Sequence, residues 1–320
     1  MDDPAALEIW NHRLAEIAEE MGFQLERAAL SPNIKERHDC SSALFSPDGR
    51  LAAQAADIPV HLGSMPLSVQ AVIARFVGEE ELSDGEVAIV NDPYAGGSHL
   101  PDVTLVAPVF EGGRRIGWVA SRAHHADVGG ATPGSMGVGT RALGDALPEA
   151  ETMPPAMGPR YEEFAHVPAP LVYRPMTIDE EGQRIPPTRL TDALAERFAA
   201  GCRAPDERRG DLAAQRASIE IGRRGLARLV AEHGADRVLA LEDALIDYAA
   251  RLMRARIAAI PDGVYAFADS LDDDGAGTRD VALRATLSIE GEHATVDFSD
   301  SDDEVQGSLN AVGAVTLSAV

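Results

Sequence analysis

Histidine and aspartate side chains gather in one central stretch of the sequence, among several glycines. His99 and Asp102 form one cluster, and His124, His125 and Asp127 form a second. Imidazole nitrogens and carboxylate oxygens are the protein ligands that divalent transition metals take most often. The residue types therefore favour a metal or catalytic site over a set of unrelated buried histidines.

A β-hairpin explains how the two clusters can meet. Two apolar runs, 103–110 and 116–120, flank Glu-Gly-Gly-Arg, which is typical of a tight turn. The clusters lie just outside the runs, so a hairpin brings them to the same end. Neighbouring side chains of an extended strand point to opposite faces, so His124 and His125 are not both expected to bind one ion. Glycines such as Gly97 allow the backbone to approach a bound molecule closely, and we predict that Gly97 contacts the substrate.

The composition restricts the class of protein. A chain of 320 residues with 45% hydrophobic residues can bury a sizeable core, in one or two domains. The net charge of −24 argues against a nucleic-acid groove, which needs clustered lysine and arginine. No apolar run is long enough to span a membrane, and the acidic N-terminus does not resemble a secretory signal. We expect a cytoplasmic protein in which Cys40 and Cys202 are free thiols.

The pattern of apolar residues predicts an α+β fold. A helix is expected over 5–29 and a short hairpin over 42–53. Four segments are predicted: a metal-binding α/β core over 1–136, a Pro-rich insertion over 137–187, a helical segment over 188–258, and a β-rich segment over 259–320.

Residues that favour the first turn of a helix predict where individual helices begin. A helix is expected from Pro66 to Phe76. Asp192, Asp211 and Asp236 are expected at helix N-termini, where a carboxylate can accept bonds from free N–H groups. An apolar final segment would need another element packed on it.

Several blocks resemble a known family. The runs NDPYAGGSHLPDVTLVAPVF and ASRAHHADVGGATPGSM, together with blocks at 31–69, 184–190 and 261–275, are similar to the hydantoinase B / oxoprolinase family. That family includes subunits of ATP-dependent hydantoinases, oxoprolinases and caprolactamases, and of acetone and acetophenone carboxylases. The resemblance covers nearly the whole chain, and relatives continue past its end, so we expect a missing C-terminal part.

The resemblance implies a ligand set and a partner. The matching positions are Asp39, His99, Asp102 and His124, which suit Zn²⁺, Mn²⁺ or Fe²⁺. ATP would be handled by an A-type partner subunit, consistent with a sequence that has no P-loop motif. His61 lies in another family block and is a candidate for contact with the substrate, with a core histidine as the alternative.

The expected function follows from the resemblance. We expect the metal-dependent subunit of a hetero-oligomer that hydrolyses a hydantoin, 5-oxoproline or lactam whose carbonyl a partner has phosphorylated. His125 or Asp127 is the candidate general base or orienting group. A ketone carboxylase subunit and a truncated, non-catalytic metal-binding paralogue are alternatives. An iron oxygenase has the ligand types but not the surrounding motifs.

Overall fold

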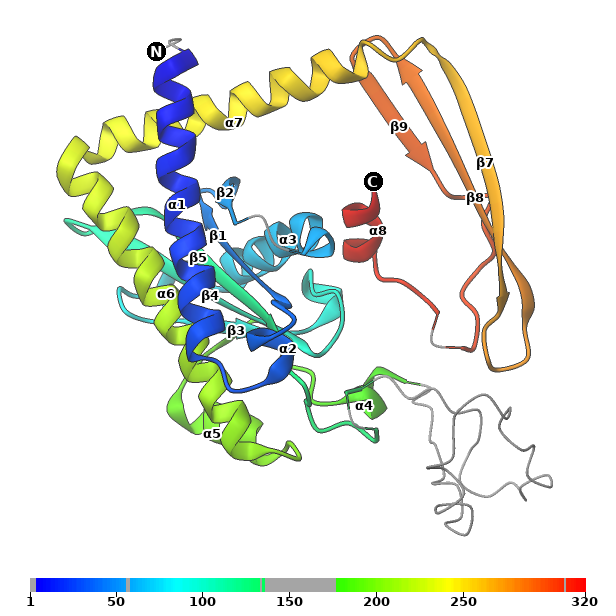
Figure 1. The fold of residues 1–320 in the computed structure, drawn as a ribbon, viewed down its shortest axis with the longest axis horizontal. Helices are drawn as coiled ribbons and strands as arrows, with labels where there is room; N and C mark the ends of the chain where they lie inside the picture. The colour runs from blue at the N-terminus through cyan, green and yellow to red at the C-terminus, as the bar shows by residue number, and fades with distance from the viewer. Residues whose placement is uncertain (1–3, 56–57, 133, 136–176, 308) are drawn as a thin grey trace.

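The computed structural model describes residues 4–55, 58–132, 134–135, 177–307 and 309–320 (Figure 1). These residues form the predicted α+β fold, with antiparallel sheets and helices. The predicted insertion lies outside the described residues as far as residue 176. No helix in the described part of the chain is both long and apolar enough to cross a membrane.

A six-stranded antiparallel sheet forms the centre of the body, in the order β2-β1-β5-β4-β3-β6. Its middle is the predicted hairpin of β4 (Asp102–Glu111) and β5 (Arg114–His124). Gly112 and Gly113 have φ values of 58° and 80°, and positive φ at both positions is what a two-residue type I′ turn requires. The other strands are β1 (Cys40–Phe45), β2 (Leu51–Gln54), β3 (Ala88–Val90) and β6 (Thr188–Arg189).

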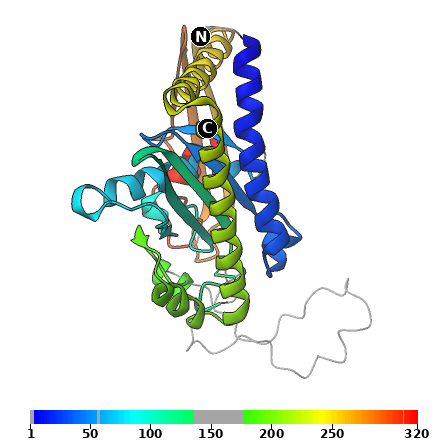
Figure 2. The same cartoon turned by 90° about the vertical axis from the view of Figure 1, so that its left-hand side faces the viewer.

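Helices cover both faces of this sheet (Figures 1 and 2), so β4 and β5 are almost wholly buried. The helices of the body are α1 (Pro4–Ala28), α2 (Pro32–Lys35), α3 (Pro59–Arg75), α4 (Ile178–Glu181), α5 (Asp192–Ala200), α6 (Pro205–His233) and α7 (Ala235–Ile257), with short 3₁₀ turns η1 (Gly78–Glu80) and η2 (Pro93–Ala95). On β4, Leu105 joins the core beneath α1 and α6, whereas its neighbour Val106 joins the core beneath α3.

The helix α3 begins earlier than predicted. The expected start at Pro66 is wrong, because Pro66 lies inside the helix and Pro59 occupies its first turn. Proline is favoured at a first helical position, so the sequence offers two possible starts and the earlier one is used. As a consequence, His61 lies on the first turn of α3.

One of the three predicted N-terminal acids lies elsewhere. Asp192 and Asp236 are in first turns, as predicted, but α6 begins before Asp211. The buried Asp211 carboxylate accepts hydrogen bonds from the backbone N–H groups of Leu30 and Ser31, at 2.8 and 3.0 Å. Asp211 therefore binds the chain that follows α1 to the middle of α6 rather than capping a helix.

The chain leaves the body along α7 and forms a separate three-stranded sheet (Figure 1). Its strands are β7 (Gly263–Asp273), β8 (Arg279–Glu290) and β9 (His293–Asp297), within the segment predicted to be β-rich. The final apolar segment forms α8 (Gly313–Ala319), which returns to α3. There the Ser318 hydroxyl donates to the Val60 carbonyl at 2.6 Å.

Candidate metal centre

The open end of the β4–β5 hairpin brings together three of the candidate ligands. Asp102 begins β4 directly opposite His124, which ends β5, and His99 lies in the turn before β4. Oδ1 of Asp102 is 3.2 Å from Nε2 of His99 and 3.1 Å from Nδ1 of His124. The two imidazole nitrogens are themselves 3.1 Å apart. The three ligand atoms therefore converge on one point.

These separations fit a divalent cation. Metal–ligand bonds of about 2.1 Å at right angles place neighbouring ligand atoms about 3.0 Å apart. Two imidazoles and one carboxylate are donors that would hold such an ion, and Asp39 as a further ligand stays a prediction. The donor set is thus suited to Zn²⁺, Mn²⁺ or Fe²⁺.

The second oxygen of Asp102 has its own neighbours. Oδ2 accepts a hydrogen bond from the Ser98 hydroxyl and lies 3.5 Å from Nε2 of His61. The ligand atoms of Asp39, His61 and Asp102 all lie within 4.8 Å of one another. The Asp39 carboxylate is also 3.8 Å from Nδ1 of His124. Asp39 and His61 therefore both lie beside the three converging ligands.

The charges in the cluster depend on one another. Burial alone would raise the pKa of Asp102, but hydrogen bonds with His124, His61 and His99 outweigh it and hold that pKa well below its ordinary range. Burial opposes the charged form of His99, yet the bond with Asp102 raises the pKa of that imidazole. Asp102 is therefore ionised at neutral pH, as a metal ligand must be.

Glu181, at the end of α4, is a neighbour of the cluster that the sequence does not reveal. Its carboxyl is half-buried, and burial raises its pKa while the nearby His99 acts in the opposite direction. The Ala131 N–H donates to the Glu180 carbonyl at 2.7 Å, which holds α4 against the loop after β5. Because the contact joins segments far apart in the chain, no local pattern marks it.

Arg122 is a second residue that the sequence analysis missed. It lies fully buried on β5, where burial lowers its pKa to about 10 and the charge of Asp102 acts in the opposite direction. The guanidinium donates to four oxygens: the hydroxyls of Thr104, Ser64 and Ser68, and the carbonyl of Gly96. These bonds fix α3 and the loop before β4, the two elements that carry His61 and His99.

His125 lies on the opposite face of the sheet from His124. Both N–H groups of the Gln215 side chain donate to backbone carbonyls, of Val103 and Ser121, so its Oε1 accepts from Nε2 of His125 at 2.9 Å. Burial lowers the pKa of His125 to about 4, so the imidazole is neutral at neutral pH. The ring lies beneath α6 and is not among the converging ligand atoms of the described residues, so a catalytic role for His125 stays a prediction.

Asp127 and Gly97 also have structural partners. Asp127 accepts hydrogen bonds from the backbone N–H and the guanidinium of Arg203, both at 2.6 Å, and so joins the loop after β5 to the segment before α6. The Gly97 N–H donates to the Asp92 carbonyl at 3.1 Å, and a Cβ there would lie only 2.9 Å from that oxygen. Substrate contact at Gly97 stays a prediction.

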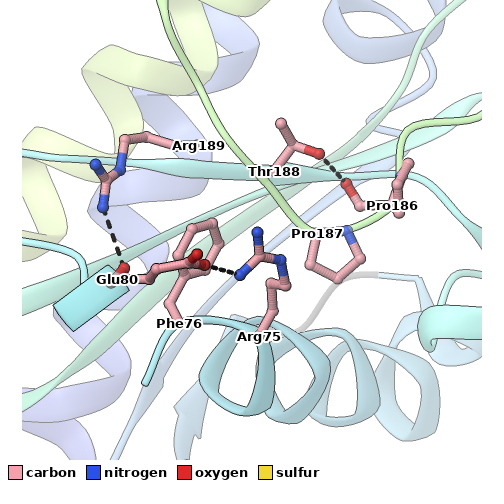
Figure 3. A pocket seen from close by; sticks show the side chains of 7 residues that line it. All are labelled: Arg75, Phe76, Glu80, Pro186, Pro187, Thr188 and Arg189. Carbon is pink, nitrogen blue, oxygen red and sulfur yellow. Dashed lines mark hydrogen bonds and ion pairs between the residues drawn. The ribbon is translucent and has the colours of Figure 1, made fainter. Parts of the chain in front are cut away.

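An open hollow of about 630 Å³ lies away from the cluster (Figure 3). The guanidinium carbons of Arg75 and Arg189 lie 5.3 and 5.8 Å from the centre of the Phe76 ring. Arg75 pairs with the Glu80 carboxylate, and Arg189 donates to the Glu80 carbonyl at 3.1 Å. Both cations already have partners, and we assign no ligand to this hollow.

Sequence comparison identifies relatives of the chain. The profile of the Hydantoinase B/oxoprolinase family matches residues 3–145 and 166–320. The 5-oxoprolinase 1 of Arabidopsis thaliana is 35% identical over 99% of this chain and 24% of its own length. The caprolactamase subunit beta of Pseudomonas jessenii is 30% identical over 99% of this chain and 49% of its own length. The chain thus spans half or less of these relatives.

Solved structures share the fold. The ATP-dependent caprolactamase of Pseudomonas jessenii superposes with a TM-score of 0.80 and 28% identity, over 99% of this chain and 49% of that one. A nucleotide-free acetone carboxylase superposes with a TM-score of 0.74 over 94% of this chain and 38% of that one, and its 18% identity supports the fold alone. Because the family profile matches most of the sequence, the chain belongs to the hydantoinase B/oxoprolinase family.

Proposed function

We propose that this chain is the metal-binding part of an ATP-dependent hydrolase of cyclic amides. The observation that carries the proposal is the convergence of His99, Asp102 and His124, within a fold that the chain shares with a caprolactamase. Lactams, hydantoins and 5-oxoproline all contain the cyclic amide bond that such an enzyme would open.

The requirement for ATP follows from the chemistry of the amide. An amide resists attack because its nitrogen donates electrons into the carbonyl group. Phosphorylation of the carbonyl oxygen removes that donation and makes the carbon electrophilic. We assign this step to a separate A-type subunit, because the related caprolactamase is ATP-dependent and its similar chain is a beta subunit. The working enzyme would then be a hetero-oligomer.

The ligands of the cluster would hold the metal. A divalent ion bound there would supply positive charge beside the activated carbonyl and a water of lowered pKa. His99 and His124 would offer ring nitrogens and Asp102 a charged oxygen, and the hairpin fixes Asp102 opposite His124. Zn²⁺, Mn²⁺ and Fe²⁺ all suit this set.

Glu181 is the side chain that we assign as proton acceptor. Its carboxyl is near His99, and a pKa raised by burial makes the carboxylate a stronger base than an exposed one. His125 and Asp127 instead position the end of β5 and its loop, through Gln215 and Arg203. Their replacement is expected to act on folding rather than on the chemical step.

The test is reconstitution with an A-type partner and ATP, using caprolactam, 5-oxoproline and hydantoin as substrates. We expect release of ADP and of ring-opened product from at least one of them. Turnover should be lost in His124→Ala and kept in His293→Ala, whose side chain is exposed on β9. Absence of ring opening, together with bicarbonate-dependent consumption of a ketone, would instead support a carboxylase.

A further inference from the structure

The separate sheet of β7, β8 and β9 has one apolar face and one more polar face. Residues paired across antiparallel strands point to the same face, and so do residues two apart along one strand. Tyr265 pairs with Leu287, which pairs in turn with Val296. By this rule the face of Tyr265 also carries Phe267, Leu271, Val281, Leu283, Ala285 and Ile289. The opposite face carries small and polar residues, among them Arg284, Thr286 and Ser288.

Much of the apolar face is open to solvent. Phe267 is 70% exposed, and Tyr265, Leu271 and Leu283 are exposed as well. Asp269 is the one charged residue of this face between Tyr265 and Leu271. A sheet with one apolar face normally buries that face against another layer of secondary structure. The sheet lies apart from the body at the end of α7 (Figure 1), and the described residues supply no such layer over these side chains.

The second half of α7 is similarly uncovered. The buried residues of this helix lie between Val238 and Leu245, in its first half. Tyr248, Leu252 and Met253 are exposed, although a helix gains most of its stability from the packing of an apolar face. Tyr248 and Leu252 also line an open hollow of about 500 Å³, whose other walls are α1 and β2. Exposed apolar side chains therefore extend from the body along α7 to the sheet.

The similar proteins indicate what covers these side chains. The caprolactamase subunit beta matches 99% of this chain, and the solved caprolactamase superposes over 99% of it, so α7 and the sheet belong to the shared part. The match takes up only 49% of that subunit, so about half of the subunit has no counterpart in this chain. An additional polypeptide of that size is large enough to supply the missing layer.

We propose that the apolar face of β7, β8 and β9 and the exposed side of α7 bind a polypeptide that corresponds to this unmatched half. The occupant presents aliphatic and aromatic side chains to Phe267 and Leu283 on the sheet, and it covers Tyr248 and Leu252 on α7. Exposed apolar patches of this kind mark protein interfaces. None of these four residues belongs to the metal centre, so the inference does not rest on the proposed function.

Co-expression tests the proposed surface. The chain would be produced together with the half of the caprolactamase subunit beta that it does not match, and we expect the two to purify as a one-to-one complex. Hydroxyl-radical labelling, read by mass spectrometry, should fall at Phe267 in the complex and stay unchanged at Val264, which is 72% exposed on the opposite face. Phe267→Ser should lower the recovery of the complex by roughly tenfold or more, because buried aromatic anchors carry much of the affinity of an interface. Val264→Ser is the matched control and should leave the recovery unchanged.

Three outcomes would overturn the proposal. These are the absence of a complex, equal recovery of the complex with Phe267→Ser and Val264→Ser, and unchanged labelling of Phe267 in the complex. A chain that dimerises by itself, with Phe267 protected from labelling in the dimer, would also overturn it, because the occupant would then be a second copy. If Phe267→Ser fails to fold, the labelling of Phe267 in the unmodified chain, alone and in the complex, still decides.

Discussion

Asp102 and His124 face each other across β4 and β5, as the first pair of a ladder that ends at Glu111 and Arg114. Side chains alternate along a strand, so a slip of one residue between these strands would turn one of the two ligands to the opposite face. The cores on both sides of the sheet prevent such a slip. The metal centre therefore depends on the register of the hairpin.

The alternation at the end of β5 predicts opposite effects on bound metal for two neighbouring histidines. His124→Ala should lose bound metal, because it removes one of the three converging ligands, and the metal-free protein should lose about 1–3 kcal/mol of stability, because the buried Asp102 carboxylate loses a hydrogen-bond donor. His125→Ala should retain metal and lose about 1–3 kcal/mol, because the buried Gln215 carbonyl loses its donor. Urea unfolding and elemental analysis measure the two effects. Metal loss in His125→Ala with unchanged stability would contradict this assignment.

The buried guanidinium of Arg122 predicts a large loss of stability. Arg122→Met should lower the free energy of unfolding by about 3–5 kcal/mol, since four buried oxygens lose their donor. Arg114→Met is the control, because Arg114 is mostly exposed and pairs with Asp236 at the surface, a contact worth less than about 1 kcal/mol. Similar losses in the two variants, measured by urea unfolding, would show that Arg122 has no special structural role.

Glu242 on α7 predicts a dependence of stability on pH. It is 1% exposed, and both its carboxyl oxygens have no hydrogen-bond partner among the described residues. Burial and the charges of Asp243 and Asp48 raise its pKa to about 8, although Arg50 acts in the opposite direction. The folded chain thus keeps a proton on Glu242, whereas the unfolded chain releases it when the pH rises above the ordinary pKa of 4.5.

The sign of the effect follows from proton uptake. Between about pH 4.5 and about pH 8 the folded state binds more protons than the unfolded state, so the free energy of unfolding should fall as the pH rises and then level off. Each unit of raised pKa corresponds to roughly 1.4 kcal/mol. Glu242→Gln should remove this slope, and Glu19→Gln, at an exposed position on α1, should keep it. A slope of equal size in Glu242→Gln would assign it to other groups.

The contact between α3 and α8 predicts a clash at a glycine. A Cβ at Gly63 would lie 2.8 Å from the Ser318 backbone, so Gly63→Ala should displace α8 and speed its amide hydrogen exchange. Gly22→Ala on α1 is the control, because a Cβ there meets nothing within 4 Å. That change should stabilise the protein by up to about 1 kcal/mol, through the better helix propensity of alanine. Unchanged amide exchange of α8 in Gly63→Ala would contradict the prediction that the added Cβ displaces this helix.

The sequence predicts those parts of the site that lie within one hairpin. The two apolar runs and their turn are local, so the meeting of Asp102 with His124 follows from strand pairing alone. Arg122 and Glu181 could not be found in this way, because their partners come from distant segments that only the folded sheet brings together. For the same reason Asp211 resembled a helix cap and is instead a buried partner of the chain after α1.

Metal content is the most direct test of the centre formed by His99, Asp102 and His124. The purified chain would be loaded with Mn²⁺ or Zn²⁺, dialysed and analysed for bound metal, beside His99→Ala, His124→Ala and the exposed control His293→Ala. We expect retained metal in the unmodified chain and in the control, and loss of the ion at His99 and His124 in the other two. Equal metal content in all four proteins would contradict the proposed metal centre.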